Sequence, residues 1–231
     1  MISKLDSRGK VQTITAGVFM EGKDIVEGFL KENGIADLNK KMQLLDQYVK
    51  LLIETNKLIN LVSRKADVAD IWLNHILDSL LPVGIMALNG KTILDFGTGG
   101  GLPGIPLKII FPESYMYLLD SRQRKMEAVK KIIKKLDLQE CLTICSRIEL
   151  LDKSWHNYFD VIVCRSVRIE EKYWRELNKL SSRAGRLYIY KAKKLDDMEV
   201  LSNALKHDIS HELVGTRTLI ELKKEDVPRG T

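Results

Sequence analysis

The sequence predicts an α/β fold: a mostly parallel sheet with helices on both faces, preceded by a helical segment. After Gly90, short β-type runs alternate with amphipathic helical runs, which is the order of βαβ units. From about Asp24 to Leu88 the apolar spacing is helical instead. With 231 residues, the chain is long enough for one main domain carrying an appended helical part.

The first third is expected to contain one long helix and a second, interrupted one. Apolar residues of the first recur at helical spacing: Leu38, Met42, Leu45, Val49, Leu52 and Ile59. The second stretch, VADIWLNHILDSLLPVGIMAL (68–88), is interrupted at Pro82. We therefore expect a flexible N-terminal extension over residues 1–23, a helical cap over 24–89 packed on the core, and a ligand-binding core over 90–231.

The core should contain five strands in parallel-sheet order and a terminal hairpin. The expected strands are KTILDF (91–96), YMYLLD (115–120), CLTICS (141–146), FDVIVCR (159–165) and GRLYIYK (185–191). Helical runs cover 122–136 and 171–180, and β-rich runs around Val214 to Arg217 predict a hairpin at the sheet edge.

The composition favours a polyanionic partner. Lysine and arginine outnumber aspartate and glutamate by 37 to 31, which gives a net charge of +6. No apolar run approaches the roughly 18 residues of a membrane span, and the first twenty residues lack a signal peptide's apolar segment. We expect a cytoplasmic protein without a membrane partner.

The cysteines indicate neither a disulfide framework nor a metal site. Cys141, Cys145 and Cys164 are odd in number and have no CxxC spacing. All three are expected to be buried, reduced thiols, and no metal is expected.

The stretch ILDFGTGGGLPGIP (93–106) predicts the ligand-binding loop. A short apolar run ends at Asp95 and is followed by five glycines: Gly97, Gly99, Gly100, Gly101 and Gly104. Glycine adopts φ > 0 easily and lets the main chain approach a ligand without a Cβ in the way. In an open parallel sheet, ligands bind beyond the carboxyl ends of the strands, where the strand order reverses.

The spacing of these glycines separates the candidate ligands. The absence of GxxxxGK[ST] excludes a P-loop nucleotide triphosphatase. A dinucleotide-type GxGxxG fits only in a register that begins at Gly99, four residues past Asp95, and Pro103 fits the first turn of a helix. The register D-x-G-x-G-x-G over residues 95–101 resembles motif I of class I S-adenosylmethionine-dependent methyltransferases, whose cofactor carries no phosphate.

The ends of the next two strands fit an adenosine. Asp120, nineteen residues beyond Gly101, is placed to accept hydrogen bonds from ribose hydroxyls, a feature that NAD enzymes share. After the third strand, Ile148 is placed to pack on an adenine ring. The same residues, SRIE (146–149), also fit a helix capping box with Ser146 as N-cap and Glu149 three residues on.

Five segments now stand in the order and spacing of one family. They are HILDSL (75–80), DFGTGGGLPGIPL (95–107), LLDSRQRK (118–125), SRIE (146–149) and VIVCRSV (161–167). Together they resemble the RsmG (GidB) family of bacterial 16S ribosomal RNA methyltransferases, over about residues 24–222. Two features differ: Ala192 in YKAKK replaces the usual glycine of a Lys-Gly pair, and the first twenty-odd residues have no counterpart.

The resemblance implies transfer of a methyl group from S-adenosyl-L-methionine to N7 of a guanine in 16S ribosomal RNA. The partner would be 16S ribosomal RNA or the 30S subunit; the sequence does not define the oligomeric state, and a monomer is our expectation. Residues 90–231 would form the S-adenosylmethionine-binding methyltransferase core. The motifs imply these cofactor-binding residues: Gly97, Gly99, Gly101, Leu102, Asp120, Ser121, Ile148, Glu149 and Arg165.

This reaction needs little from protein side chains. Guanine N7 offers a free lone pair and has no proton to lose, so no general base is expected, and catalysis rests on positioning and electrostatics. Arg165, at the exposed carboxyl end of the fourth strand, is the one catalytic candidate. Cys164 is expected to face the sheet packing rather than act as a nucleophile. His75 and Asp78 share a helix face and either contact the cofactor's amino-acid end or, as we favour, pin the cap onto the core.

RNA contacts are expected from the helical run 122–136. Its apolar arc places Lys130, Lys131, Lys134 and Lys135 on the opposite, solvated face. Arg122, Arg124 and Lys125, in the first turn, lie nearest the cofactor edge and are better candidates for phosphate. KAKK (191–194) is a second basic candidate.

Two other functions remain open at this point. An NAD-dependent dehydrogenase would share the shifted GxGxxG and Asp120. A non-enzymatic RNA-binding or ribosome assembly factor on a methyltransferase scaffold would keep the basic surface without the chemistry.

Overall fold

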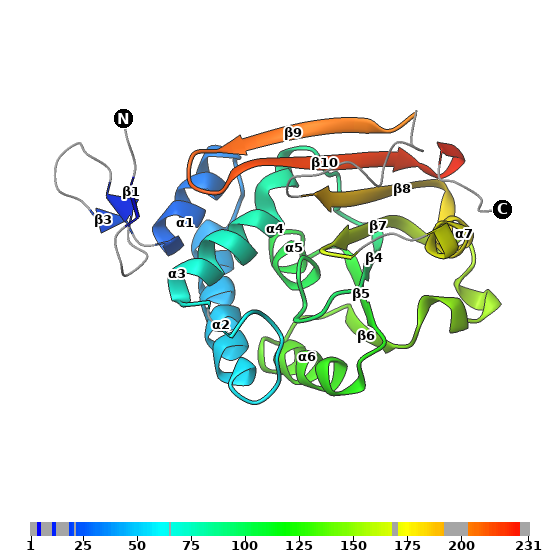
Figure 1. Cartoon of the computed structure of the whole chain (residues 1–231), viewed down its shortest axis with the longest axis horizontal. Helices are drawn as coiled ribbons and strands as arrows, with labels where there is room; N and C mark the ends of the chain where they lie inside the picture. Colours follow the sequence, from blue (N-terminus) through cyan, green and yellow to red (C-terminus); the bar gives the residue numbers. More distant parts are fainter. Residues whose placement is uncertain are drawn as a thin grey trace.

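The computed structural model describes residues 4–5, 11–12, 19–20, 22–64, 66–167, 171–191 and 203–226. At the N-terminus three two-residue strands pair antiparallel: β1 (Lys4–Leu5), β2 (Val11–Gln12) and β3 (Phe19–Met20). Two helices and one interrupted helix follow, then a seven-stranded sheet (Figure 1).

The helical first third is confirmed, with two differences from the expected elements: an additional helix at its start and an earlier end of the long helix. Its elements are α1 (Gly22–Glu32), α2 (Leu38–Asn56), α3 (Val68–Ile71), the π-helix η1 (Trp72–Leu77), α4 (Asp78–Leu80) and the 3₁₀-helix η2 (Leu81–Gly84). The long helix ends at Asn56 and does not reach Ile59. The Asn56 side chain accepts hydrogen bonds from the amides of Leu61 and Val62, which turns the chain back on the helix end. Pro82 lies in the 3₁₀ turn, where the break was expected.

The sheet has the order β6-β5-β4-β7-β8-β10-β9. Its strands are β4 (Thr92–Phe96), β5 (Tyr115–Asp120), β6 (Cys141–Cys145), β7 (Phe159–Arg165), β8 (Ser181–Lys191), β9 (Leu205–His211) and β10 (Gly215–Lys223). The pairings from β6 to β8 are parallel, whereas β10 and β9 add an antiparallel hairpin at the edge, as predicted. The chain order reverses between β4 and β7, so a ligand site is expected at their carboxyl ends.

Helices cover both faces of the sheet, which confirms the predicted fold class. The remaining helical elements are α5 (Gly104–Ile110), α6 (Gln123–Lys135), α7 (Glu171–Leu180) and the short η3 (Ile148–Leu150), η4 (Lys153–Trp155) and η5 (Lys224–Asp226). Along β4, Ile93 packs into the core shared with α5, α6 and the N-terminal helices, whereas Leu94 packs into a second core with α7. Within the described ranges no helix is long and apolar enough to cross a membrane.

One cysteine differs from expectation. Cys141 and Cys164 are buried, but Cys145 is exposed. Cys145 ends β6, which is the edge strand of the sheet, so its outer side has no neighbouring strand to cover it.

Candidate functional site

The glycine-rich loop joins the end of β4 to α5 and is tied to the neighbouring strand. The amides of Gly97 and Thr98 donate to the Leu119 carbonyl of β5 at 2.8 and 3.1 Å. The amide of Gly99 donates to the Asp120 carboxylate at 3.2 Å. Gly97, Gly99 and Gly101 have φ of 76°, 58° and 95°, so the alternate glycines of the D-x-G-x-G-x-G register are the ones in the left-handed region.

Asp95 is fully buried and joins the two ends of this loop by hydrogen bonds. One carboxylate oxygen accepts hydrogen bonds from the Thr98 hydroxyl at 2.6 Å and from the Gly104 amide at 2.8 Å, while Oδ1 has no partner among the described residues. Gly104 must lack a side chain, since a Cβ there would lie 2.2 Å from Leu118 Cδ2. Burial raises the pKa of Asp95 to about 6, although its two hydrogen bonds act in the opposite direction.

The stability of the protein is therefore expected to depend on pH through Asp95. Its pKa in the folded state exceeds its ordinary value of 3.8, so its contribution is complete below about pH 4 and is lost as the pH rises through 6. Relative to Asp95→Asn, the unmodified protein should gain free energy of unfolding as the pH is lowered from about 7 to about 4. Urea unfolding of both proteins across this range gives the difference between their free energies of unfolding. The other titrating groups are the same in both proteins, so their contributions cancel in this difference. A difference that does not change with pH would contradict the assignment.

Asp120, at the end of β5, is held ionised. Burial alone would raise its pKa, but hydrogen bonds from the side chain and backbone of Arg122 and from the Gly99 amide lower it overall. The Arg122 guanidinium binds both carboxylate oxygens at 3.0 Å. A carboxylate fixed in this way is an acceptor at the pocket wall.

A cavity of about 670 Å³ opens at the carboxyl ends of β4, β5, β6 and β7. Eight of the nine sequence-predicted cofactor residues line it: Gly97, Gly99, Leu102, Asp120, Ser121, Ile148, Glu149 and Arg165. Gly101 is not among the lining residues. A Cβ on Gly101 would lie 2.5 Å from Ile105 Cδ1, so this glycine permits packing of the loop on α5.

Further residues line the cavity, and most of them have no direct signal in the sequence, although His75, Gly100, Arg122 and Lys125 belong to the patterns described above. They are Leu61, Val62, His75, Phe96, Thr98, Gly100, Leu119, Arg122, Lys125, Ser146, Arg147, Ser166, Val167, Lys172 and Tyr173. Lys172 and Tyr173 follow the fourth parallel strand, where ligand contacts are general, so that rule could have indicated them. Leu61 and Val62 reach the cavity only because α2 docks on the loop, which no local pattern indicates.

The capping-box interpretation of SRIE is wrong. The 3₁₀-helix η3 begins at Ile148 with Arg147 as its N-cap and no side-chain capping bond. The Ser146 hydroxyl instead donates to the Arg147 carbonyl at 2.9 Å. Ile148 is buried at the cavity wall, which leaves it placed for contact with an aromatic ring.

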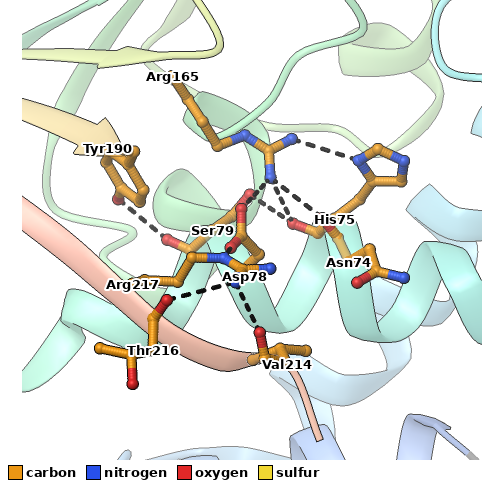
Figure 2. A network of polar contacts seen from close by, with 9 residues as sticks. All are labelled: Asn74, His75, Asp78, Ser79, Arg165, Tyr190, Val214, Thr216 and Arg217. Atoms are coloured by element: carbon orange, nitrogen blue, oxygen red, sulfur yellow. Dashed lines mark hydrogen bonds and ion pairs between the residues drawn. The ribbon is translucent and has the colours of Figure 1, made fainter. Parts of the chain in front are cut away.

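Arg165 joins the pocket to the helical first third. Figure 2 shows it reaching from β7 to the helix that carries His75 and Asp78, with Nη1 at 2.8 Å from the Asp78 carboxylate and 3.3 Å from the His75 carbonyl. Arg217 of β10 donates to the other oxygen of Asp78 at 2.6 Å. Asp78 therefore links two strands to the cap helix, which is the pinning role that we favoured. The Tyr190 hydroxyl adds a contact to the Ser79 carbonyl at 3.0 Å.

His75 is poorly suited to act as a base that becomes charged. Burial, and then the positive charge of Arg165, lower its pKa to about 4. One ring nitrogen lies 3.5 Å from the Arg165 guanidinium. The described lining of the cavity thus provides acceptors, the guanidinium groups of three arginines and apolar walls, and His75 does not supply a base with a pKa near neutral.

The basic face of α6 is present as predicted. Met126, Val129, Ile132, Ile133 and Leu136 are buried, and Lys130, Lys131, Lys134 and Lys135 are exposed. Arg122 and Lys125 line the cavity itself. Of the second basic candidate, residues 192–194 and the Ala192 difference lie outside the described residues.

The cavity fits S-adenosylmethionine. Its size is within the usual range for small-molecule sites, and a Cβ on Gly99 would meet only the Gly97 carbonyl, at 3.9 Å, so the loop presents bare backbone to a ligand. Asp120 would face the ribose, Ile148 the adenine, and the loop the amino-acid portion.

Solved structures share this fold. The tRNA (m1A58) methyltransferase TrmI of Aquifex aeolicus aligns with a TM-score of 0.53 at 14% identity, covering 76% of this chain and 75% of that one. TYW2 of P. horikoshii, in complex with MeSAdo, aligns with a TM-score of 0.52 at 9% identity, covering 72% and 65%. Such low identities concern the fold alone. The fold is that of the class I methyltransferases.

Sequence comparison narrows the class to a family. A profile described as rRNA small subunit methyltransferase G matches residues 41–219. The ribosomal RNA small subunit methyltransferase G of Chlorobaculum tepidum is 37% identical over 174 residues, covering 75% of this chain and 78% of that protein. That of Chlorobium phaeobacteroides is 34% identical over 189 residues, covering 81% and 78%. The chain belongs to the rRNA small subunit methyltransferase G family, which confirms the resemblance and removes the dehydrogenase alternative.

Proposed function

We propose that this protein transfers the methyl group of S-adenosylmethionine to N7 of a guanine in 16S ribosomal RNA. We further propose that it acts in the cytoplasm, as a monomer, on this RNA or on the 30S subunit. The observation that carries the proposal is the match to relatives named ribosomal RNA small subunit methyltransferase G over 78% of their length, with the glycine loop, Asp120 and Arg165 at one cavity. The choice of N7 follows from the resemblance of the five sequence segments.

The chemistry of N7 agrees with the lining of the cavity. When bound, S-adenosylmethionine supplies an electrophilic methyl group on a positively charged sulfur. The acceptor lone pair lies in the plane of the base and carries no proton, so the chain needs to align it and exclude water rather than remove a proton. Arg165 ends β7, the strand next to β4, which carries the glycine loop. Its side chain is only 9% exposed and is held by the ion pair with Asp78. It is our candidate for positioning the acceptor.

RNA is proposed to approach along α6. The exposed lysines of α6 could contact RNA phosphates on the helix surface, and Arg122 and Lys125 could contact them at the cavity. Such contacts position the RNA without specifying its sequence, and they weaken with salt.

The proposal predicts one modified base. Purified protein incubated with labelled S-adenosylmethionine and 30S subunits from a strain that lacks this gene should label a single guanine at N7, mapped by mass spectrometry of 16S ribosomal RNA. Subunits from the same strain with the gene intact should accept little label, because the position is already methylated. Label on another atom or another RNA would contradict the proposal, and S-adenosylhomocysteine binding without any transfer would favour the assembly-factor alternative.

A further inference from the structure

The helix α2 contacts the glycine loop directly. Tyr48 is fully buried, and its hydroxyl donates a hydrogen bond of 2.9 Å to the carbonyl of Gly100. This bond joins residues 52 positions apart in the sequence. Because Gly100 follows Gly99, the Tyr48 bond fixes the loop at the residue next to the one whose amide binds Asp120.

The same helix supplies a wall of the cavity through the turn that follows it. Asn56 Oδ1 accepts hydrogen bonds from the amides of Leu61 and Val62 at 2.8 and 3.0 Å. Both of these apolar residues are buried and line the cavity. A Cβ on Gly100 would lie 3.2 Å from Leu61 Cβ, so the turn and the glycine loop are packed closely against each other.

We propose that Tyr48 and Asn56 are positioning residues of the S-adenosylmethionine site. Tyr48 holds the glycine loop, and Asn56 holds the Leu61–Val62 turn as the facing wall. The helical segment proposed above as a cap over residues 24–89 is then an integral part of the cofactor pocket. The inference takes the nature of the cofactor from the proposed function but does not depend on which RNA atom is methylated.

The physical reason is preorganisation. Without the Tyr48 hydroxyl, the buried carbonyl of Gly100 loses its partner in the bound conformation, and the loop gains access to other conformations. A cofactor must then supply the free energy of reordering the loop, which lowers its affinity in proportion to the loss of the competent state.

The test is calorimetric titration of S-adenosylhomocysteine into the full-length protein, without RNA. Tyr48→Phe should bind roughly tenfold more weakly, the fold-change that corresponds to loss of one buried hydrogen bond. The KM for S-adenosylmethionine should rise by a similar factor with kcat little changed, because binding rather than the transition state is affected. The matched control is Tyr188→Phe, which removes a buried hydroxyl beside Glu221, in a different cavity, and should bind within about twofold of the unmodified protein.

A second pair of variants separates hydrogen bonding from packing. Asn56→Ala removes the acceptor and should weaken binding, whereas Asn56→Asp keeps an acceptor oxygen and should restore most of it. If Tyr48→Phe and Asn56→Ala unfold more easily yet bind S-adenosylhomocysteine like the unmodified protein, their role is structural only and the inference is wrong. An unmodified protein that binds S-adenosylhomocysteine but methylates no guanine would contradict the proposed function alone.

Discussion

Replacement of Gly99 by valine is expected to abolish measurable binding of S-adenosylhomocysteine while the fold survives. Gly99 lines the cavity with φ of 58°, and its missing side chain leaves open space toward a ligand. A valine would project into that space and force the loop away from the left-handed region, which breaks the bond from its amide to Asp120. We expect a loss of at least about a hundredfold in affinity, or about 2.8 kcal/mol.

Gly34 provides the matched control for this substitution. It lies in the turn between α1 and α2 with φ of 67°, and a Cβ there would meet nothing within 4 Å. Gly34→Val therefore imposes a similar backbone strain far from the cavity, and it should lower the melting temperature without changing the affinity. Calorimetric titration and thermal unfolding of both variants make the comparison. Equal affinities for Gly99→Val and the unmodified protein would show that the loop does not contact the cofactor.

Local patterns were sufficient for the sheet and for the loop. Each predicted strand is present because its apolar run is bounded by polar or glycine-containing turns, and the edge hairpin follows from the β-rich runs near Val214. The glycine register was predictable because positive φ and close approach both require glycine at fixed spacing.

What depends on tertiary contacts could not be predicted in the same way. The end of α2 is decided by the Asn56 side chain, which accepts hydrogen bonds from amides five and six residues further on. The helical spacing of Ile59 therefore predicts a helix that continues too far. Exposure of Cys145 depends on the place of β6 at the sheet edge, which is a property of strand order. The wall built by Leu61 and Val62 comes from a segment that meets the glycine loop only after folding.

Asp78→Ala is expected to be strongly destabilising, since it leaves two guanidinium groups without their shared carboxylate. The Arg165 and Asp78 side chains are only 9% and 13% exposed, and Arg217 is 23% exposed. Removal of one partner from a buried ion pair typically costs about 3–5 kcal/mol, because the remaining charge is left uncompensated. For a chain of this size that corresponds to a fall of roughly 6–20 °C in melting temperature. Methyl transfer should also fall, since Arg165 loses its anchor at the cavity.

A matched surface group tests whether burial is the cause. Asp46 is likewise shared by two cations, with Lys50 at 2.8 Å and Lys23 at 3.6 Å, but those lysine side chains are 68% and 38% exposed. Asp46→Ala should cost no more than about 1 kcal/mol, because water screens such pairs. Adding Arg165→Met to Asp78→Ala should recover part of the lost stability, since it removes one of the two uncompensated charges. If the two aspartate variants melt together, or if the double variant is less stable than Asp78→Ala, the network contributes by packing rather than by charge, and Arg165 is held at the cavity by its hydrogen bonds to the helix carbonyls.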